Sequence, residues 1–200
     1  MSQTRYVLWD FGDTLVDERW MWPCPEGFPE WADAYRALGP GELGSRWNRG
    51  ELTLEEFATR LAGDVGTGFD DACAHMKRCC ESIRFFENAW ATARAHLMPQ
   101  AIVTINPDLF TRFVAPNYGL DSVFDTIVTS WQEGIEDKAE LCEIALRRLG
   151  GSDAGEALLI DNIEANVEAW RARSGQAYLF VSDDEQFAVD VLGLLAAEDS

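Results

Sequence analysis

Short apolar runs alternate with longer segments of helical character over most of the chain, which is typical of a parallel sheet with helical crossovers. The runs are apolar at nearly every position, as expected for strands that are buried on both faces. The fold class predicted is therefore α/β with a Rossmann-like parallel sheet. We predict strands at 6–9, 101–103, 126–128, 157–160 and 177–181, and helices at 88–97, 107–117, 138–149, 163–173 and 184–195.

Residues 17–84 break this alternation, because the patterns there are helical only. We predict helices at 29–38, 53–61 and 70–81. Thr53 and Glu56 match a capping box, in which the Thr side chain accepts from the first turn of the helix and the Glu side chain reaches back. The chain thus divides into an α/β core, residues 1–16 and 85–200, and an inserted all-helical segment, residues 17–84.

Several aromatic side chains lie near the start of the inserted segment. They either pack inside it or line a substrate pocket, and of these two roles we favour packing. The residues are Trp20, Trp22, Phe28, Trp31 and Trp47.

Composition narrows the range of partners. The chain has 200 residues, and its 16 Lys and Arg against 35 Asp and Glu give a net charge of −19 at pH 7. This charge repels nucleic acid and anionic membranes, so neither is an expected partner. We find no leader-like stretch and no apolar stretch of membrane-spanning length, which predicts a cytoplasmic protein. These properties do not specify an oligomeric state.

The cysteines predict free thiols. Their number, five, is odd, and they do not form the spaced doublets of a zinc site. Cys79 and Cys80 are neighbours on a predicted helix, where we expect packing rather than redox chemistry.

The segment 6–15, Tyr-Val-Leu-Trp-Asp-Phe-Gly-Asp-Thr-Leu, is the most informative for function. Its apolar run ends at Asp10, and the following Gly12 and Asp13 indicate a turn. Sites in open α/β sheets lie at the carboxyl ends of strands, so Asp10 is a candidate nucleophile. The alternative is that Asp10 only caps the helix that follows.

Four segments, in order along the chain, resemble the four motifs of the haloacid dehalogenase (HAD) superfamily, which includes phosphatases, phosphonatases, dehalogenases and phosphotransferases. They are Asp-Phe-Gly-Asp-Thr-Leu at 10–15, Ala-Ile-Val-Thr at 101–104, Lys138 at a predicted helix start, and Leu-Leu-Ile-Asp-Asn at 158–162. The resemblance spans residues 5 to 181. It implies a HAD core, in which the helical segment 17–84 is a small cap that closes over the site.

The resemblance also implies roles for particular residues. Asp10 would attack the substrate and form a covalent aspartyl intermediate, while Thr104 and Lys138 would hold an anionic group. A small phosphorylated molecule is the substrate class that it implies. In the turn after Asp10, the backbone N–H groups of Phe11, Gly12 and Asp13 would also donate to the anionic group of the substrate.

The same motifs imply a weak Mg²⁺ site. The candidate ligands are Asp10, the Gly12 carbonyl, Asp161 and Asn162. Asn162 stands where the family has a metal-binding Asp, and Asn166 stands at a further position that is usually acidic. Each amide removes a full negative charge from a site that prefers anionic oxygen ligands.

The departures from the motifs leave alternatives open. Family phosphatases carry a second Asp, the general acid and base, at the position of Gly12, and Asp13 is a candidate replacement for it. The loss of such a group costs about 10²- to 10⁴-fold in rate. One alternative is therefore a HAD-fold binding or regulatory protein without turnover. A second, less favoured alternative is a metal-independent haloacid dehalogenase.

Overall fold

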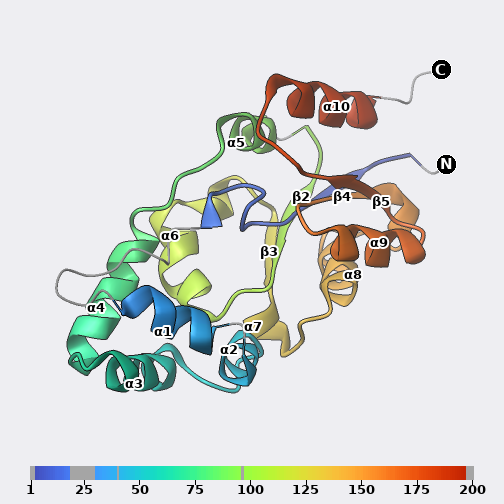
Figure 1. Cartoon of the computed structure of the whole chain (residues 1–200). Coiled ribbons are helices and arrows are strands. Elements are labelled where there is room, and N and C mark those ends of the chain that lie inside the picture. The colour runs from blue at the N-terminus through green and yellow to red at the C-terminus, as the bar shows by residue number, and fades with distance from the viewer. Residues whose placement is uncertain (1–2, 19–29, 40, 96, 197–200) are drawn as a thin grey trace.

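The chain forms a five-stranded parallel sheet, and this confirms the predicted α/β class (Figure 1). The computed structural model describes residues 3–18, 30–39, 41–95 and 97–196. The strand order is β3-β2-β1-β4-β5, so the first strand is central. The strands are β1 (Tyr6–Trp9), β2 (Gln100–Thr104), β3 (Thr126–Thr129), β4 (Ala157–Asp161) and β5 (Gln176–Leu179).

Helices cover both faces of the sheet, because side chains alternate between two buried clusters along each strand. Val7 and Trp9 pack into one cluster, and Tyr6 and Leu8 into the other. The first face is covered by α5 (Glu87–Arg94), the π-helical segment η2 (Phe110–Val114), α6 (Ala115–Asn117), η3 (Leu120–Ser122) and α10 (Glu185–Ala196). The second face is covered by α8 (Lys138–Arg148) and α9 (Glu164–Ala172), with short turns at α7 (Ser130–Glu133) and η4 (Ala154–Glu156).

Between β1 and α5 the described residues form four helices, and Figure 1 shows them grouped together beside the sheet. The chain segments that lead to and from this group run antiparallel, with a bridge between Val16 and Phe85. The Phe86 N–H donates to the Leu15 carbonyl at 2.9 Å. The helices are α1 (Trp31–Leu38), α2 (Glu42–Asn48), α3 (Leu54–Val65) and α4 (Phe69–Cys80).

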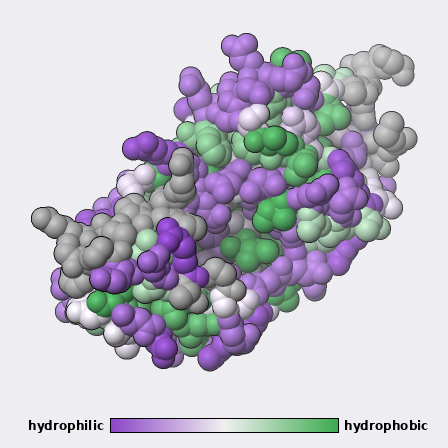
Figure 2. Space-filling model, viewed as in Figure 1, coloured by the Kyte–Doolittle hydropathy of each residue, from purple (hydrophilic) through white to green (hydrophobic). Residues whose placement is uncertain are grey.

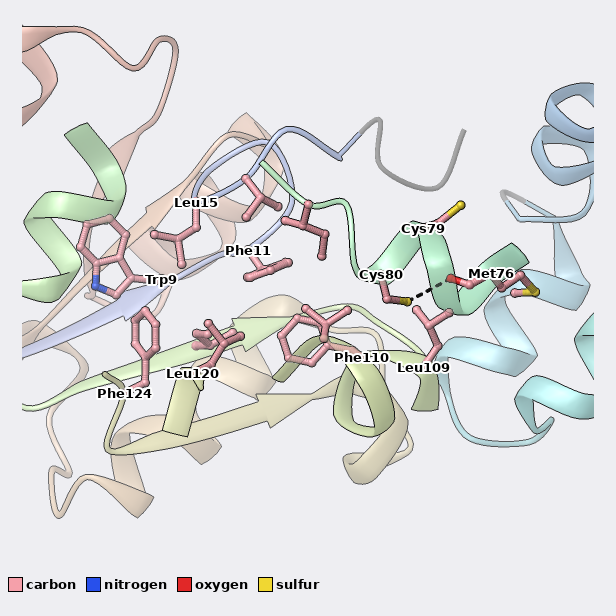
Figure 3. Packing of buried hydrophobic residues seen from close by; sticks show 14 of the residues in the cluster. Trp9, Phe11, Leu15, Met76, Cys79, Cys80, Leu109, Phe110, Leu120 and Phe124 are labelled. Carbon is pink, nitrogen blue, oxygen red and sulfur yellow. Dashed lines mark hydrogen bonds between the residues drawn. The ribbon is translucent and has the colours of Figure 1, made fainter. Parts of the chain in front are cut away.

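Two predictions for the helical group are confirmed in the described residues: the start of α3 and the packing of aromatic side chains. The capping box at the start of α3 is present, with Thr53 accepting from the Glu56 N–H. Trp31 and Trp47 are 1% and 2% exposed, which confirms packing for these two residues; Trp20, Trp22 and Phe28 lie outside the described residues. Figure 3 shows that the same cluster continues from Trp9 through Phe11 and Phe110 towards α4.

The polar character of the surface and the free state of the described cysteines agree with what the composition predicts. Polar and charged side chains cover most of the face that is drawn in Figure 2. Over the described ranges, no helix has both the length and the apolar character that crossing a membrane requires. The cysteines within those ranges are free, namely Cys73, Cys79, Cys80 and Cys142.

Buried Asp108 links the helical group to the core. Its carboxylate accepts from Trp47 Nε1 at 2.8 Å, from the Leu54 N–H at 3.1 Å and from Arg112 at 3.1 Å. Asp108→Ala leaves these donors without their acceptor, so we expect the free energy of unfolding to fall by about 3 kcal/mol. Urea denaturation measures the loss, and Asp121→Ala on the surface is the control. An Asp108→Ala midpoint equal to that of the control would contradict this role.

Candidate active site

Sheet register places Asp10 between two neighbouring strands. Trp9, the last residue of β1, pairs with Ile102 of β2 and with Ile160 of β4. The Asp10 N–H continues the ladder and donates to the Ile160 carbonyl at 2.9 Å. Asp10 therefore lies at the carboxyl edge of the sheet, where the residue is 8% exposed.

A tight turn follows Asp10. The Phe11 carbonyl accepts from the Leu15 and Val16 N–H groups at 2.9 and 3.1 Å, and Asp13 has a positive φ of 50°. The Phe11 ring is buried and lies 4.8 Å from the ring of Phe110, edge to face. Phe11 therefore faces the site with its backbone rather than with its ring.

Lys138, the first residue of α8, enters the site from the face of the sheet opposite Phe11. Its ammonium group donates to Asp10 Oδ1 at 2.5 Å and to the Val103 carbonyl at 2.6 Å, and Asp161 Oδ2 lies 3.1 Å away. An ammonium group has three N–H donors, and these three acceptors match that number. Lys138 is 4% exposed, so the ion pairs are shielded from water.

Burial and charge compete at this pair. Burial raises the pKa of Asp10 to about 6, against the opposing effect of Lys138, and Asp161 adds to the rise. Burial also opposes the charge of Lys138, but Asp10 and Asp161 outweigh it and raise the pKa of this group. Two carboxylates against one ammonium leave a net charge of −1, which favours a further cation at the site.

Asp161, which is 0% exposed, helps to fix the position of the Lys138 ammonium group. Asp161 Oδ1 accepts from the Ile163 N–H at 2.8 Å, and both carboxylate oxygens accept from Asn166 Nδ2 at 3.1 Å. With Lys138, the two oxygens thus have several donors, so Asp161 orients the ammonium group. The sequence placed Asn166 in the fourth motif, whereas its hydrogen bonds to Asp161 are visible only in the structure.

Two oxygens converge at the hydroxyl of Thr14. Thr14 Oγ1 lies 3.3 Å from Asp10 Oδ2 and 3.4 Å from Asn162 Oδ1. One hydroxyl proton serves only one of these acceptors at a time. Asp10 and Asn162 therefore present neighbouring oxygens with free lone pairs. A hard cation such as Mg²⁺ prefers oxygen ligands of this kind.

Thr104 ends β2 at the same edge of the sheet. It pairs with Thr129 of β3, and its side chain is buried. Its hydroxyl accepts from Asn106 Nδ2 at 2.7 Å, so the hydroxyl proton is directed away from Asn106. The structure thus brings Asp10 and Lys138 into direct contact, and it places Thr104 one residue beyond the carbonyl that Lys138 binds.

Sequence reasoning missed Glu18, which lies just after the turn. A Cβ atom built on Gly12 would lie 2.7 Å from Glu18 Oε1, so this carboxylate adjoins the turn backbone. Glu18 keeps solvent-exposed surface, yet protein atoms crowd its carboxyl group. The loss of water there, followed by the charges of Asp10 and Asp13, raises the pKa of Glu18 to about 7.

Solved structures that are similar to this chain are HAD-like hydrolases. A predicted HAD-like family hydrolase from Porphyromonas gingivalis has a TM-score of 0.68 and 16% identity, covering 98% of this chain and 99% of that one. A HAD family enzyme from Bacteroides thetaiotaomicron, complexed with magnesium and inorganic phosphate, has a TM-score of 0.65 and 11% identity, covering 91% and 96%. L-2-haloacid dehalogenase from Xanthobacter autotrophicus has a TM-score of 0.67 and 18% identity, covering 97% and 85%.

No protein-family model matches the sequence, and no curated protein sequence matches it either. The similarity therefore lies in the fold, over nearly the whole chain. The similar structures include both a phosphate complex and a dehalogenase, so the fold alone does not define the substrate class.

Proposed function

We propose, from the HAD-like hydrolase fold of this chain, that it hydrolyses a small phosphorylated molecule through a covalent intermediate on Asp10. One observation carries the proposal: the Asp10 carboxylate ends the central strand and is held by the buried ammonium group of Lys138. A carboxylate that is fixed by a cation in a nearly dry site is suited to nucleophilic attack. The net charge of the whole chain, −19, fits a cytoplasmic enzyme for small molecules rather than a partner of nucleic acid.

In this mechanism, an Asp10 oxygen attacks phosphorus, and the bond from phosphorus to the leaving oxygen breaks. The Thr104 hydroxyl and backbone N–H groups of the turn at 11–14 would donate to the phosphoryl oxygens. Lys138 already donates to three acceptors, so a phosphoryl oxygen would replace one of them. The ammonium charge then serves the substrate and the nucleophile together.

We propose that residues 17–84 form a cap over this site and that residues 1–16 and 85–200 form the core. The antiparallel bridge between Val16 and Phe85 supports this division, because both connections lie at one place, directly after the turn that follows Asp10. A cap attached there would cover the carboxyl edge of the sheet and would select the substrate.

The residues present fit a Mg²⁺ ion. Asp10 Oδ2 and Asn162 Oδ1 would hold it, since both lie within reach of the Thr14 hydroxyl, whereas the oxygens of Asp161 already have donors. The Gly12 carbonyl stays a predicted ligand. Bound Mg²⁺ would offset the negative charge of the site and of a phosphate group. The magnesium and phosphate complex of the similar Bacteroides enzyme supports this choice of ion.

Asn162→Asp tests the metal site. A further unit charge about 4 Å from a divalent ion gains about 2 kcal/mol even at the dielectric constant of water, which is more than tenfold in affinity. We therefore expect the Mg²⁺ concentration for half-maximal turnover to fall at least tenfold. Asn117→Asp, an exposed residue of α6, is the matched control. An unchanged Mg²⁺ dependence in Asn162→Asp would contradict the placement of the ion.

A panel of phosphate monoesters, assayed with Mg²⁺ and with a chelator, tests the proposed function. We expect turnover that requires Mg²⁺. Phosphate binding without turnover of any ester would favour the binding or regulatory protein, for which Gly12, Asn162 and Asn166 are the sequence argument. Halide release from short 2-haloacids in the presence of chelator would favour the dehalogenase.

A further inference from the structure

The Glu18 carboxylate occupies the place that a side chain at residue 12 would take. A Cβ atom built on Gly12 would lie 2.7 Å from Glu18 Oε1, 2.8 Å from Cδ and 3.3 Å from Oε2. Contacts below 3.0 Å require a shift, so a side chain at residue 12 would displace the Glu18 carboxylate from this place. Glycine at position 12 thus gives the Glu18 carboxylate room beside the backbone two residues from Asp10.

Local structure holds Glu18 in this place. Its N–H donates to Asp13 Oδ1 at 2.9 Å, and Asp13 itself has the left-handed φ that closes the turn. Val16, two residues before Glu18, forms a parallel bridge with Gly12 and an antiparallel bridge with Phe85, so the backbone that leads to Glu18 is held on two sides. The carboxylate of Asp13, the replacement that the sequence suggested, is instead used to bind this backbone.

The Glu18 carboxylate is available to a substrate. Among the residues that the structure describes, none donates a hydrogen bond to it, and the residue is exposed to solvent. Glu18 therefore has both solvent-exposed surface and a carboxylate that adjoins the turn backbone beside Asp10. A carboxylate that lies beside the turn next to the nucleophile, on a residue that reaches the surface, is well placed to exchange protons with a leaving group and with water.

Two other described side chains at the site, Asp10 and Lys138, are engaged in other roles. Asp10 is the nucleophile, and the three N–H donors of Lys138 face three protein acceptors. An alkyl phosphate needs such a proton, because an alkoxide is a poor leaving group at neutral pH, whereas a nitrophenolate leaves without one.

We propose that Glu18 is the general acid and base of the reaction, a role that rests on the proposed function. Glu18 carries the proton at the start. As Asp10 attacks phosphorus, the bond from phosphorus to the leaving oxygen breaks, and that oxygen takes the Glu18 proton. Glu18 then removes a proton from water, whose oxygen attacks the phosphorus of the aspartyl phosphate. Phosphate and the Asp10 carboxylate are released, and Glu18 is protonated again.

The test compares two esters, 4-nitrophenyl phosphate and glycerol 2-phosphate, with the variant Glu18→Gln. The value of kcat/KM reports the phosphorylation step, in which only the glycerol ester needs the acid. We expect kcat/KM to fall about 10²- to 10⁴-fold for glycerol 2-phosphate and less than about tenfold for 4-nitrophenyl phosphate. Glu168→Gln, an exposed residue of α9 paired with Arg171, should leave both values unchanged.

Equal losses on the two esters would overturn the assignment, since a role in folding or positioning does not depend on the leaving group. A loss that depends on the leaving group in Asp13→Asn and not in Glu18→Gln would overturn it as well. Wild-type turnover of 4-nitrophenyl phosphate establishes the proposed function separately. Failure of the wild-type chain on both esters would overturn that function and this assignment together.

A second variant pair moves the carboxylate. Glu18→Ala clears the space beside residue 12, and Gly12, which does not have a positive φ, then accepts a side chain without backbone strain. We expect Gly12→Asp combined with Glu18→Ala to regain at least about tenfold of the kcat/KM that Glu18→Ala loses on glycerol 2-phosphate. If kcat/KM of the double variant on glycerol 2-phosphate does not exceed that of Glu18→Ala, a carboxylate at this place does not act as the acid.

Discussion

Asp10→Asn is expected to reduce turnover of any phosphate ester by at least about 10⁴-fold. An amide oxygen is a far weaker nucleophile than a carboxylate, and removal of a catalytic nucleophile costs up to about 10⁶-fold in kcat. The change is isosteric and removes one of the two carboxylates beside Lys138, so the fold should remain intact. Steady-state kinetics and urea denaturation of the same preparation measure the two effects separately.

The control for this variant is Asp121→Asn, an exposed carboxylate in η3. It should retain the kcat and the stability of the wild-type chain. If Asp10→Asn keeps more than about a tenth of the wild-type turnover, the carboxylate of Asp10 does not form the intermediate. A collapse of stability in Asp10→Asn would mean instead that this carboxylate serves the fold more than the chemistry.

Lys138→Met is expected to lower the free energy of unfolding by about 3–5 kcal/mol. The substitution keeps much of the side-chain volume but leaves Asp10 and Asp161 buried without their cation, and uncompensated buried charge has this cost. Turnover should be lost too, because the ammonium group faces the nucleophile at 2.5 Å. Urea denaturation gives the energy; a variant as stable as the wild-type chain would show that the pair is not buried as described.

Asp161→Asn completes a double-mutant cycle with Lys138→Met. In the wild-type background it removes a buried carboxylate that accepts from the Ile163 N–H and from Asn166 and lies beside Lys138, so it should be destabilising. In the Lys138→Met background it removes one unpaired buried charge, so we expect it to restore at least about 1 kcal/mol. The predicted reversal of sign depends on contact between the two groups; an equal effect in both backgrounds would mean that they act independently.

The sequence predicted the sheet well because its strands are buried on both faces. Tyr6–Trp9 is apolar throughout and is followed by Asp10, so both ends of β1 were visible in the pattern. The end of β5 was less clear: Val181 was predicted in the strand, yet the strand ends at Leu179 and Val181 is 82% exposed. Contact between Asp10 and Lys138 followed from two motifs at one edge of the sheet.

Two short helices were not predicted, for different reasons. Helix α2 contains Gly44, a poor helix former, where a Cβ atom would lie 1.7 Å from the Gly39 carbonyl oxygen. The glycine allows a close approach to the backbone of Gly39, at the C-terminal end of α1, and the sequence pattern does not show this local geometry. Helix α7 has four residues, which is too few to show a period. The missing information lies in local backbone geometry for α2 and in length for α7.

Glu18 was missed because turn residues carry no periodic signal. Its place depends on the φ of Asp13 and on the absence of a side chain at Gly12. The sequence identified Gly12 as the loss of an acidic group, and it did not indicate that another carboxylate adjoins the same backbone. The hydrogen bonds from Asn166 to Asp161 were hidden in the same way, since they depend on the first turn of α9.

The central claim is that Asp10 becomes covalently phosphorylated, and chemical trapping tests it most directly. Wild-type protein that is turning over 4-nitrophenyl phosphate with Mg²⁺ would be quenched with borohydride, which reduces an aspartyl phosphate to an alcohol, and its peptides would be mapped by mass spectrometry. We predict reduction at Asp10, dependent on substrate and absent in Asp10→Asn. Turnover without reduction at Asp10, or with reduction at another carboxylate, would contradict the account.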